Sequence, residues 1–281
     1  MEQGQIKFSN NDFFNLAKLI QRQIHLSSYD LTLANHHENK KNNHTNKFCR
    51  YGKKMFSQAD EDGITLEIIK RLNIKKGNFI EFGVGDGLQN NTIILLSLGW
   101  QGIWFGGENI VINTKKSNRL TFYQNFITLK NILDLTKYAL TKINTIELIS
   151  LDLDGNDYYF IEELLKNGIR PKVFIAEYNS KFIPPVEFVI EYNEDHKWKN
   201  NDYYGCSLAS LDKMFKKYGY RLICCNAASG SNCFFVQDKY MNLFDDVPNN
   251  IDDIFVEPNY KPYHYYGHPT SRKTIETIIN Y

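Results

Sequence analysis

Residues 78–87 read Asn78-Phe-Ile-Glu81-Phe-Gly83-Val-Gly85-Asp-Gly87, an apolar run with one carboxylate that continues into three glycines at alternate positions. The apolar run predicts a buried strand. Glycine lacks a Cβ, so glycines at this spacing allow a sharp turn and let the backbone approach a ligand closely. The stretch therefore predicts a strand that leads into a ligand-binding turn.

Apolar runs and helical patterns alternate along the central part of the chain. The runs that predict strands buried on both faces cover residues 79–84, 102–106, 146–153 and 173–176. Helical candidates cover residues 62–72, 91–98, 133–140 and 159–166. Strands that alternate with helices predict a doubly wound α/β sheet.

A different pattern closes the domain. An amphipathic helix over residues 207–218 precedes two predicted strands, residues 220–226 and 232–237, which a short turn joins. Two consecutive strands without a helix between them are expected to be antiparallel. A mostly parallel, seven-stranded sheet that ends in such a hairpin is the Rossmann-like fold of class I methyltransferases, and dinucleotide dehydrogenases lack this hairpin.

The charge, the cysteine content and the apolar stretches of the chain argue against several classes of protein. The 33 basic and 32 acidic residues give a formal net charge of +1, which argues against a nucleic-acid partner. The five cysteines include no C-x-x-C pair, so we expect reduced thiols and no zinc site. No secretory signal is visible, and the apolar stretch at residues 92–100 is too short for a membrane span. We therefore expect a soluble, cytoplasmic protein.

The two ends of the chain differ from its centre. An amphipathic helix is predicted over residues 11–24, and the polar residues 36–47 predict a loop. We expect a helix-and-loop extension over residues 1–50, the α/β domain over 51–245 and an irregular, Tyr- and Pro-rich tail over 246–281. His264 and His268 lie in that tail among Tyr and Pro, a context that does not favour a helical metal pair.

The glycine turn favours S-adenosylmethionine as its ligand. A carboxylate at Glu81 can pair with the α-ammonium group of that cofactor, while Gly83, Gly85 and Gly87 bring the backbone close to it. A dinucleotide fingerprint would need a third glycine where Leu88 stands. The alternative is a tight strand-to-helix turn without a ligand.

The next strand supplies a second cofactor contact. It is followed by Glu108, about twenty residues beyond the glycine turn. Neighbouring parallel strands end on the same edge of the sheet, so Glu108 can accept hydrogen bonds from both ribose hydroxyls. The alternative is a solvated glutamate in a glycine-rich turn.

Polar and acidic residues also lie at the ends of the next two apolar runs, residues 146–153 and 173–176. Asp152 and Asp154 come at the end of one apolar run, and Glu177 and Asn179 at the end of the next. Because these strands end at the edge where ligands bind in open α/β sheets, we expect the four residues to converge there, with Asp152, Asp154 and Glu177 as catalytic candidates and Asp152 as a cofactor contact as well. Asp154, Glu177 and Asn179 could hold Mg²⁺ or Mn²⁺, or one carboxylate could act as a general base without a metal. A purely structural role is the third alternative.

Two other interpretations of residues 152–157 are weaker. A calcium-binding loop would need glycine where Asp157 stands, and a strand rather than a helix leads into this segment. The Asp-x-Asp-Gly pattern is also found in haloacid dehalogenase-type phosphatases, but there it lies near the start of the chain. That family is the main rival enzyme class.

Two further segments have structural and functional interpretations. Residues 56–62 precede the first core helix, where an N-cap and acidic first-turn residues are expected. Asp202-Tyr203-Tyr204-Gly205 could stack on an adenine or a sugar ring, or pack internally.

With these motifs in place, the chain resembles FkbM-type S-adenosylmethionine-dependent methyltransferases associated with bacterial surface polysaccharides. The resemblance covers about 180 residues, from Ser57-Gln58 through EFGVGDG, GWQGIWFGGE, LDLDGND and IAEYN to YYG and NCFFV. It implies S-adenosylmethionine as donor and a hydroxyl acceptor such as a sugar. It also implies cofactor contacts at Glu81, Gly83, Gly85 and Glu108, and an acceptor site lined by Asp152, Asp154 and Glu177.

Residues 1–50 and the tail fall outside this resemblance and are candidates for shaping the acceptor pocket or a homodimer contact. A non-catalytic protein that keeps the fold as a binding module is the alternative from another class. The retained acids Glu81, Glu108 and Asp152 argue against that alternative.

Overall fold

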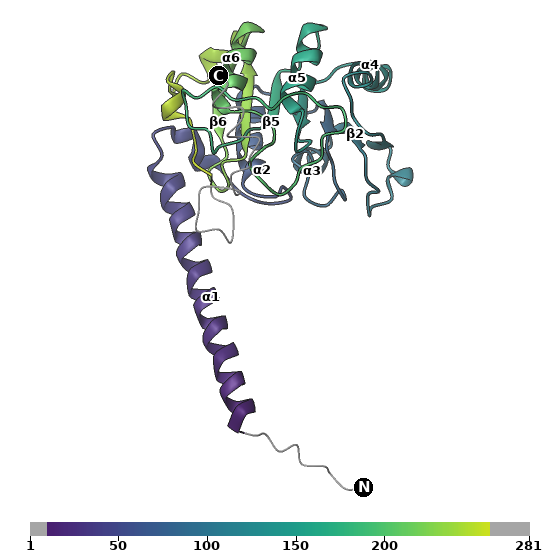
Figure 1. Ribbon diagram of the computed structural model, residues 1–281. Coiled ribbons are helices and arrows are strands. Elements are labelled where there is room, and N and C mark those ends of the chain that lie inside the picture. The colour runs from purple at the N-terminus through teal and green to yellow at the C-terminus, as the bar shows by residue number, and fades with distance from the viewer. Residues whose placement is uncertain (1–9, 259–281) are drawn as a thin grey trace, which may run out of the picture. The chain divides into compact units, whose positions relative to one another are not determined.

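The computed structural model describes residues 10–258 (Figure 1). The chain divides into two compact units, Met1–Asn43 and His44–Tyr281. The first unit contains the helix α1 (Asn10–Asn43). The second unit contains the sheet and all the predicted site residues.

The sheet has seven strands in the order β3-β2-β1-β4-β5-β7-β6. All neighbouring pairs are parallel except those that involve β7, which is antiparallel to both β5 and β6. The predicted seven-stranded class I methyltransferase sheet with its C-terminal hairpin is therefore confirmed. The strands are β1 (Asn78–Phe82), β2 (Gln101–Gly106), β3 (Leu120–Gln124), β4 (Leu148–Leu151), β5 (Val173–Glu177), β6 (Tyr220–Cys225) and β7 (Asn232–Gln237).

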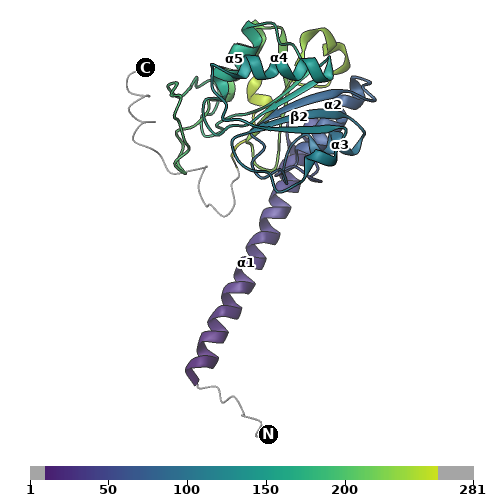
Figure 2. The ribbon, with the colours of Figure 1, turned by 90° about the vertical axis from the view of Figure 1, so that its right-hand side faces the viewer.

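Helices cover both faces of the sheet. Figures 1 and 2 show α4, α5 and α6 on one face and α2 and α3 on the other. The α-helices of this unit are α2 (Glu61–Arg71), α3 (Ile93–Ser97), α4 (Ile132–Ile143), α5 (Asp157–Lys166) and α6 (Leu208–Lys217). Short 3-10 helices lie at η1 (Lys47–Tyr51), η2 (Thr114–Lys116), η3 (Asp238–Leu243) and η4 (Ile251–Asp253). This layering buries both faces of the central strands, as their continuous apolar runs predict.

The sequence pattern predicts every strand of the sheet except β3. This strand pairs with β2 alone at the edge of the sheet, and most of its side chains are only partly buried or exposed. Such a strand lacks the continuous apolar run of a central strand, so its pattern is weak.

The polar loop predicted over residues 36–47 is wrong for most of its length, because α1 continues to Asn43. The segment contains neither glycine nor proline, and its Lys and Glu residues favour a helix. An ion pair of 2.6 Å between Lys41 and Glu38, three positions apart, adds to the helix. After Asn43 the chain enters the core of the second unit, where Phe48 and Cys49 are buried.

The first part of the predicted irregular tail packs onto the sheet unit. Val247, Ile254 and Val256 are buried, and η4 gives residues 251–253 a single 3-10 turn. His264 and His268 lie outside the described residues. None of the helices in residues 10–258 has both the length and the apolar content that a membrane span requires.

Two glycines of the turn after β1 differ in their surroundings. Gly83 has φ of +88°, and a Cβ added to it would lie 1.6 Å from the carbonyl oxygen of Asp152. Gly85 has φ of +50°, but an added Cβ would meet no atom within 4 Å. The turn is thus packed tightly against the end of β4 on one side and open at Gly85.

The substitution Gly83→Ala should destabilise the fold by at least about 3 kcal/mol, because a positive φ is combined with backbone overlap. Gly85→Ala should cost roughly 1–2 kcal/mol, the cost of the left-handed backbone alone. Denaturant unfolding of both variants measures the difference. Equal losses would contradict the tight approach of Gly83 to Asp152.

Candidate active site

The predicted site residues lie at the edge of the sheet where β1, β4 and β5 end. Pairing aligns Glu81 with Ser150, and Ser150 with Ile175. Side chains alternate between the two faces along a strand, so Glu81 and Glu177 lie on the same face of the sheet. Asp152 follows Ser150 by two positions and continues this row of polar side chains.

Glu81 is 4% exposed and is held by the start of α3. Its carboxylate accepts hydrogen bonds from the backbone N–H of Asn91 (2.9 Å), and from the backbone N–H (3.3 Å) and hydroxyl of Thr92. The indole of Trp104 donates to the same hydroxyl at 2.8 Å. Burial raises the pKa of Glu81 to about 7, although these donors oppose the shift. Glu81 therefore anchors the chain that follows the glycine turn, and its contact with an ammonium group stays a prediction.

Glu108 lies in an exposed segment just beyond β2. The backbone N–H of Val111 donates to the carbonyl of Asp86 at 2.9 Å, which fixes this segment to the glycine turn. A Cβ on Gly87 would lie 3.4 Å from the side chain of Ile110. The structure thus brings the segment that carries Glu108 beside the turn, as a ribose contact requires, and the contact itself stays a prediction.

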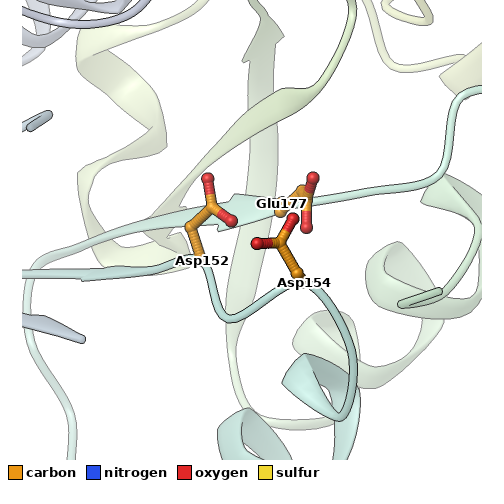
Figure 3. A group of neighbouring side chains, drawn as sticks. All are labelled: Asp152, Asp154 and Glu177. Atoms are coloured by element: carbon orange, nitrogen blue, oxygen red, sulfur yellow. The ribbon is translucent and has the colours of Figure 1, made fainter. Parts of the chain in front are cut away.

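Asp152, Asp154 and Glu177 form an acidic cluster in which one carboxylate oxygen of each lies within 4.8 Å of the others (Figure 3). Asp152 directly follows β4, Asp154 lies in the next loop and Glu177 ends β5. Burial, and then repulsion from neighbouring carboxylates, raise the pKa values of Asp152 and Glu177, which share a hydrogen bond. The structure brings together three acids that the sequence places at this edge, and their roles stay predictions.

Asp157 positions the loop of the cluster, a role that the sequence analysis missed. Its buried carboxylate accepts hydrogen bonds from the backbone N–H groups of Leu153 (2.7 Å) and Gly155 (2.8 Å). Between them Asp154 has a positive φ of 53°. Burial raises the pKa of Asp157 to about 6. These hydrogen bonds come from residues that precede Asp157, whereas the Asx turns that a sequence can indicate involve a residue that follows, so no local pattern marks this role.

The acidic cluster fits a divalent cation. Within the described residues, Oε2 of Glu177 is buried and has no hydrogen-bond partner. Three carboxylates that repel one another, with one unpartnered oxygen among them, match the oxygen-rich sites of Mg²⁺ and Mn²⁺. Asp152, Asp154 and Glu177 would hold such an ion.

Asn179 has a different set of contacts. Its side-chain amide donates to the carbonyls of Asp202 (2.8 Å) and Tyr204 (3.2 Å), and its oxygen accepts from the backbone N–H of Lys181 (3.3 Å). The structure thus assigns Asn179 to holding the loop before α6. Its role as a metal ligand stays a prediction.

The aromatic segment before α6 packs internally. Tyr204 is buried, and the hydroxyl of Tyr203 accepts a hydrogen bond from the backbone N–H of Glu191 at 3.1 Å. Gly205 donates to the carbonyl of Gly155 at 3.0 Å, which ties this segment to the loop of the acidic cluster. These contacts favour packing over stacking on a ligand.

His196 lies beside the acidic cluster, and the sequence analysis missed it. A Cβ on Gly155 would lie 2.5 Å from Cδ2 of His196, and the ring is hydrogen-bonded to the backbone of Asp154. Burial lowers its pKa, so the imidazole is neutral at neutral pH. Within residues 10–258, Nε2 is buried and has no partner. No motif surrounds His196, so only the tertiary structure identifies it.

The acids before α2 act mainly on other segments. Asp60 has the N-cap position but makes no side-chain cap bond. Its carboxylate instead accepts from the backbone N–H groups of Ala227 (3.2 Å) and Ala228 (3.1 Å) in the loop between β6 and β7. Asp62 accepts from the backbone N–H of Ser57 (2.9 Å) and of two residues before it. Glu61 and Asp62 occupy the first turn, as predicted.

Neither a protein-family model nor a curated protein matches the chain. Among solved structures, MycE, a methyltransferase of the mycinamycin biosynthetic pathway in complex with Mg, SAH and mycinamycin VI, is similar, with 10% identity over 70% of this chain and 55% of MycE (TM-score 0.42).

A Burkholderia thailandensis 1,6-didemethyltoxoflavin-N1-methyltransferase shows 7% identity over 83% of this chain and 91% of its own (TM-score 0.39). A Lactococcus lactis protein described as a hemolysin shows 11% identity over 62% of this chain and 85% of its own (TM-score 0.39). At such low identities these similarities assign no ligand to this chain. What the site can bind follows from the chain's own residues.

The substitution Glu81→Gln should reduce the dependence of stability on pH. The pKa of Glu81 is raised from 4.5 to about 7 in the folded protein, so its contribution is fully present below about pH 4.5 and is lost as the pH rises through about 7. The shift corresponds to roughly 3 kcal/mol. The free energy of unfolding should fall less between about pH 5 and about pH 8 in the variant than in the wild type. Identical pH profiles would contradict the raised pKa.

Proposed function

We propose that the protein is an S-adenosylmethionine-dependent O-methyltransferase that acts on a hydroxyl group of a small, carbohydrate-like acceptor. One observation carries this proposal: the glycine turn and the acidic cluster adjoin, because Gly83 closely approaches the carbonyl of Asp152. A donor on the turn and an acceptor at the acids would therefore be neighbours. Methyl transfer depends mainly on such positioning, since the sulfonium is already activated.

The donor side of the site comprises the glycine turn and the segment after β2. The open space at Gly85 allows the cofactor to approach the backbone. Glu108 is exposed beside the turn and can accept hydrogen bonds from the ribose hydroxyls. Asp152 borders both the cofactor and the acceptor.

On the acceptor side, the hydroxyl oxygen attacks the methyl carbon in line with the sulfur. The new C–O bond forms as the C–S bond breaks, the electron pair stays on sulfur in S-adenosylhomocysteine, and the hydroxyl proton passes to Asp152 or Glu177. A divalent cation held by Asp152, Asp154 and Glu177 would lower the pKa of that hydroxyl.

The resemblance to FkbM-type enzymes supports the identity of the acceptor. It favours a sugar or sugar-derived molecule, and a role in the synthesis of a capsule or another surface polysaccharide. The row of carboxylates at this edge is consistent with that choice, because carboxylates accept hydrogen bonds from hydroxyl groups.

Calorimetry with S-adenosylmethionine tests the donor. The wild type should bind it, and Glu108→Gln should weaken the affinity by about tenfold, because the amide is neutral and keeps only one of the two acceptor oxygens. Glu187→Gln is the matched control, since Glu187 is exposed and pairs with Lys213. No binding at millimolar concentrations would favour a non-catalytic protein and overturn the proposal.

Transfer of a labelled methyl group to a panel of saccharides tests the reaction. Asp154→Asn should lower kcat by at least about tenfold and leave the affinity for S-adenosylmethionine unchanged, because Asp154 serves the acceptor side. A chelator should have the same effect on the wild type. Full activity of Asp154→Asn would remove the acidic cluster from the mechanism.

A further inference from the structure

A second unpartnered oxygen belongs to Asn232, the residue that pairs with Glu177 in the sheet. Asn232, the first residue of β7, is 4% exposed. Among the residues that the structure describes, its side-chain oxygen Oδ1 is buried and has no hydrogen-bond partner. A buried carbonyl oxygen without a partner costs about 1–3 kcal/mol, so its retention needs an explanation.

Glu61 fixes the orientation of the Asn232 side chain. Nδ2 of Asn232 donates to Oε1 of Glu61 at 3.0 Å, and Nδ2 of Asn226 donates to the same atom at 3.0 Å. The other oxygen of Glu61 accepts from the backbone N–H of Ala59 at 2.9 Å. A carboxylate only accepts hydrogen bonds, so the nitrogen of the Asn232 amide must face Glu61 and Oδ1 must face away.

The opposite neighbour of Asn232 is Glu177. The two residues are paired in the antiparallel register of β5 and β7, so their side chains leave the same face of the sheet. Side chains paired in this way have Cβ atoms about 5 Å apart. Oε2 of Glu177 is itself buried without a partner in the described chain. Two acceptor-only oxygens on one pair of residues match a ligand that carries positive charge.

Backbone hydrogen bonds beside Glu177 and at Asn232 hold this pair of residues in place. The N–H of Tyr178 donates to the carbonyl of Ser231 at 2.8 Å, and the N–H of Asn232 donates to Oδ1 of Asn226 at 2.9 Å. Asn226 thus fixes both the backbone of Asn232 and the carboxylate of Glu61. The amide oxygen is pre-organised by segments that are far apart in the sequence.

We propose that Oδ1 of Asn232 is a fourth oxygen ligand of the divalent cation at Asp152, Asp154 and Glu177, and that Glu61 is its positioning residue. This inference rests on the cation in the proposed function. A neutral amide oxygen is a normal ligand of Mg²⁺ and Mn²⁺, and it adds no charge to a cluster of three acids.

Mn²⁺ binding measured by electron paramagnetic resonance of the free ion tests this inference on the full chain. Asn232→Leu removes the oxygen in a side chain of similar size and should weaken Mn²⁺ affinity by about tenfold or more. Its affinity for S-adenosylmethionine should stay unchanged, because β4 and β5 separate β7 from β1, the strand that leads into the glycine turn. Wild-type affinity for Mn²⁺ in this variant would overturn the inference and leave the proposed function standing.

Glu61→Gln provides a second variant in which Asn232 remains. The new side-chain amide can donate to Oδ1 of Asn232 and turn that oxygen away from the cluster, so Mn²⁺ affinity should fall here too. The variant tests the positioning role if Asn232→Leu fails to fold. Unchanged Mn²⁺ affinity in Glu61→Gln would contradict that role.

Asp154→Asn distinguishes loss of the whole cation site from loss of the fourth ligand alone. Loss of Mn²⁺ binding in Asp154→Asn but not in Asn232→Leu would leave the cation site and remove only the fourth ligand. A wild type that binds S-adenosylmethionine but no Mn²⁺ would overturn both the cation of the proposed function and the role of Asn232.

Discussion

The close approach of Gly83 to the backbone of Asp152 is the constraint on which the site depends. A side chain at Gly83 would overlap the carbonyl oxygen of Asp152, so the ends of β1 and β4 can adjoin only because glycine stands there. That contact brings the glycine turn and the acidic cluster side by side. Without it, the turn after β1 could not pack against the residue that follows β4.

The carboxylates at this edge fall into two groups that differ in their hydrogen-bond donors. Glu81 and Asp157 each accept from at least two backbone N–H groups, which compensates part of the cost of burial. Asp152 and Glu177 instead share a hydrogen bond with each other, and one oxygen of Glu177 has no partner within the described chain. The first group stabilises the loops, and the second provides the acids of the cation site that we propose.

The sequence could predict those elements of the fold that have a pattern of their own in the sequence. The glycine turn, the central strands and the final hairpin follow from local patterns, because apolar runs and glycine spacing need no tertiary information. The edge strand β3 lacks such a run. The end of α1 was misplaced because polar residues without glycine or proline are compatible with both a loop and a helix.

Within the site, the sequence could predict which acids lie together, but not which other residues lie beside them. Asp152 and Glu177 follow apolar runs, so their place at one edge follows from the alternation of strands and helices. His196 and Asn232 approach the cluster through an irregular segment and an antiparallel register, neither of which a motif marks. The contacts of Asn179 could not be predicted for the same reason, because its partners at residues 202 and 204 are distant in sequence.

The segment between β5 and α6 carries His196, which lies beside the acidic cluster, and this segment has anchors of its own. Phe182, Phe188 and Ile190 form a small apolar cluster separate from the main core, and the hydroxyl of Tyr159 in α5 donates to the carbonyl of Ile190 at 2.7 Å. Asn156, at the start of α5, binds the same segment through the carbonyl of Asn193 at 2.8 Å. Because these anchors come from α5 and its N-cap, they hold the segment independently of the glycine turn.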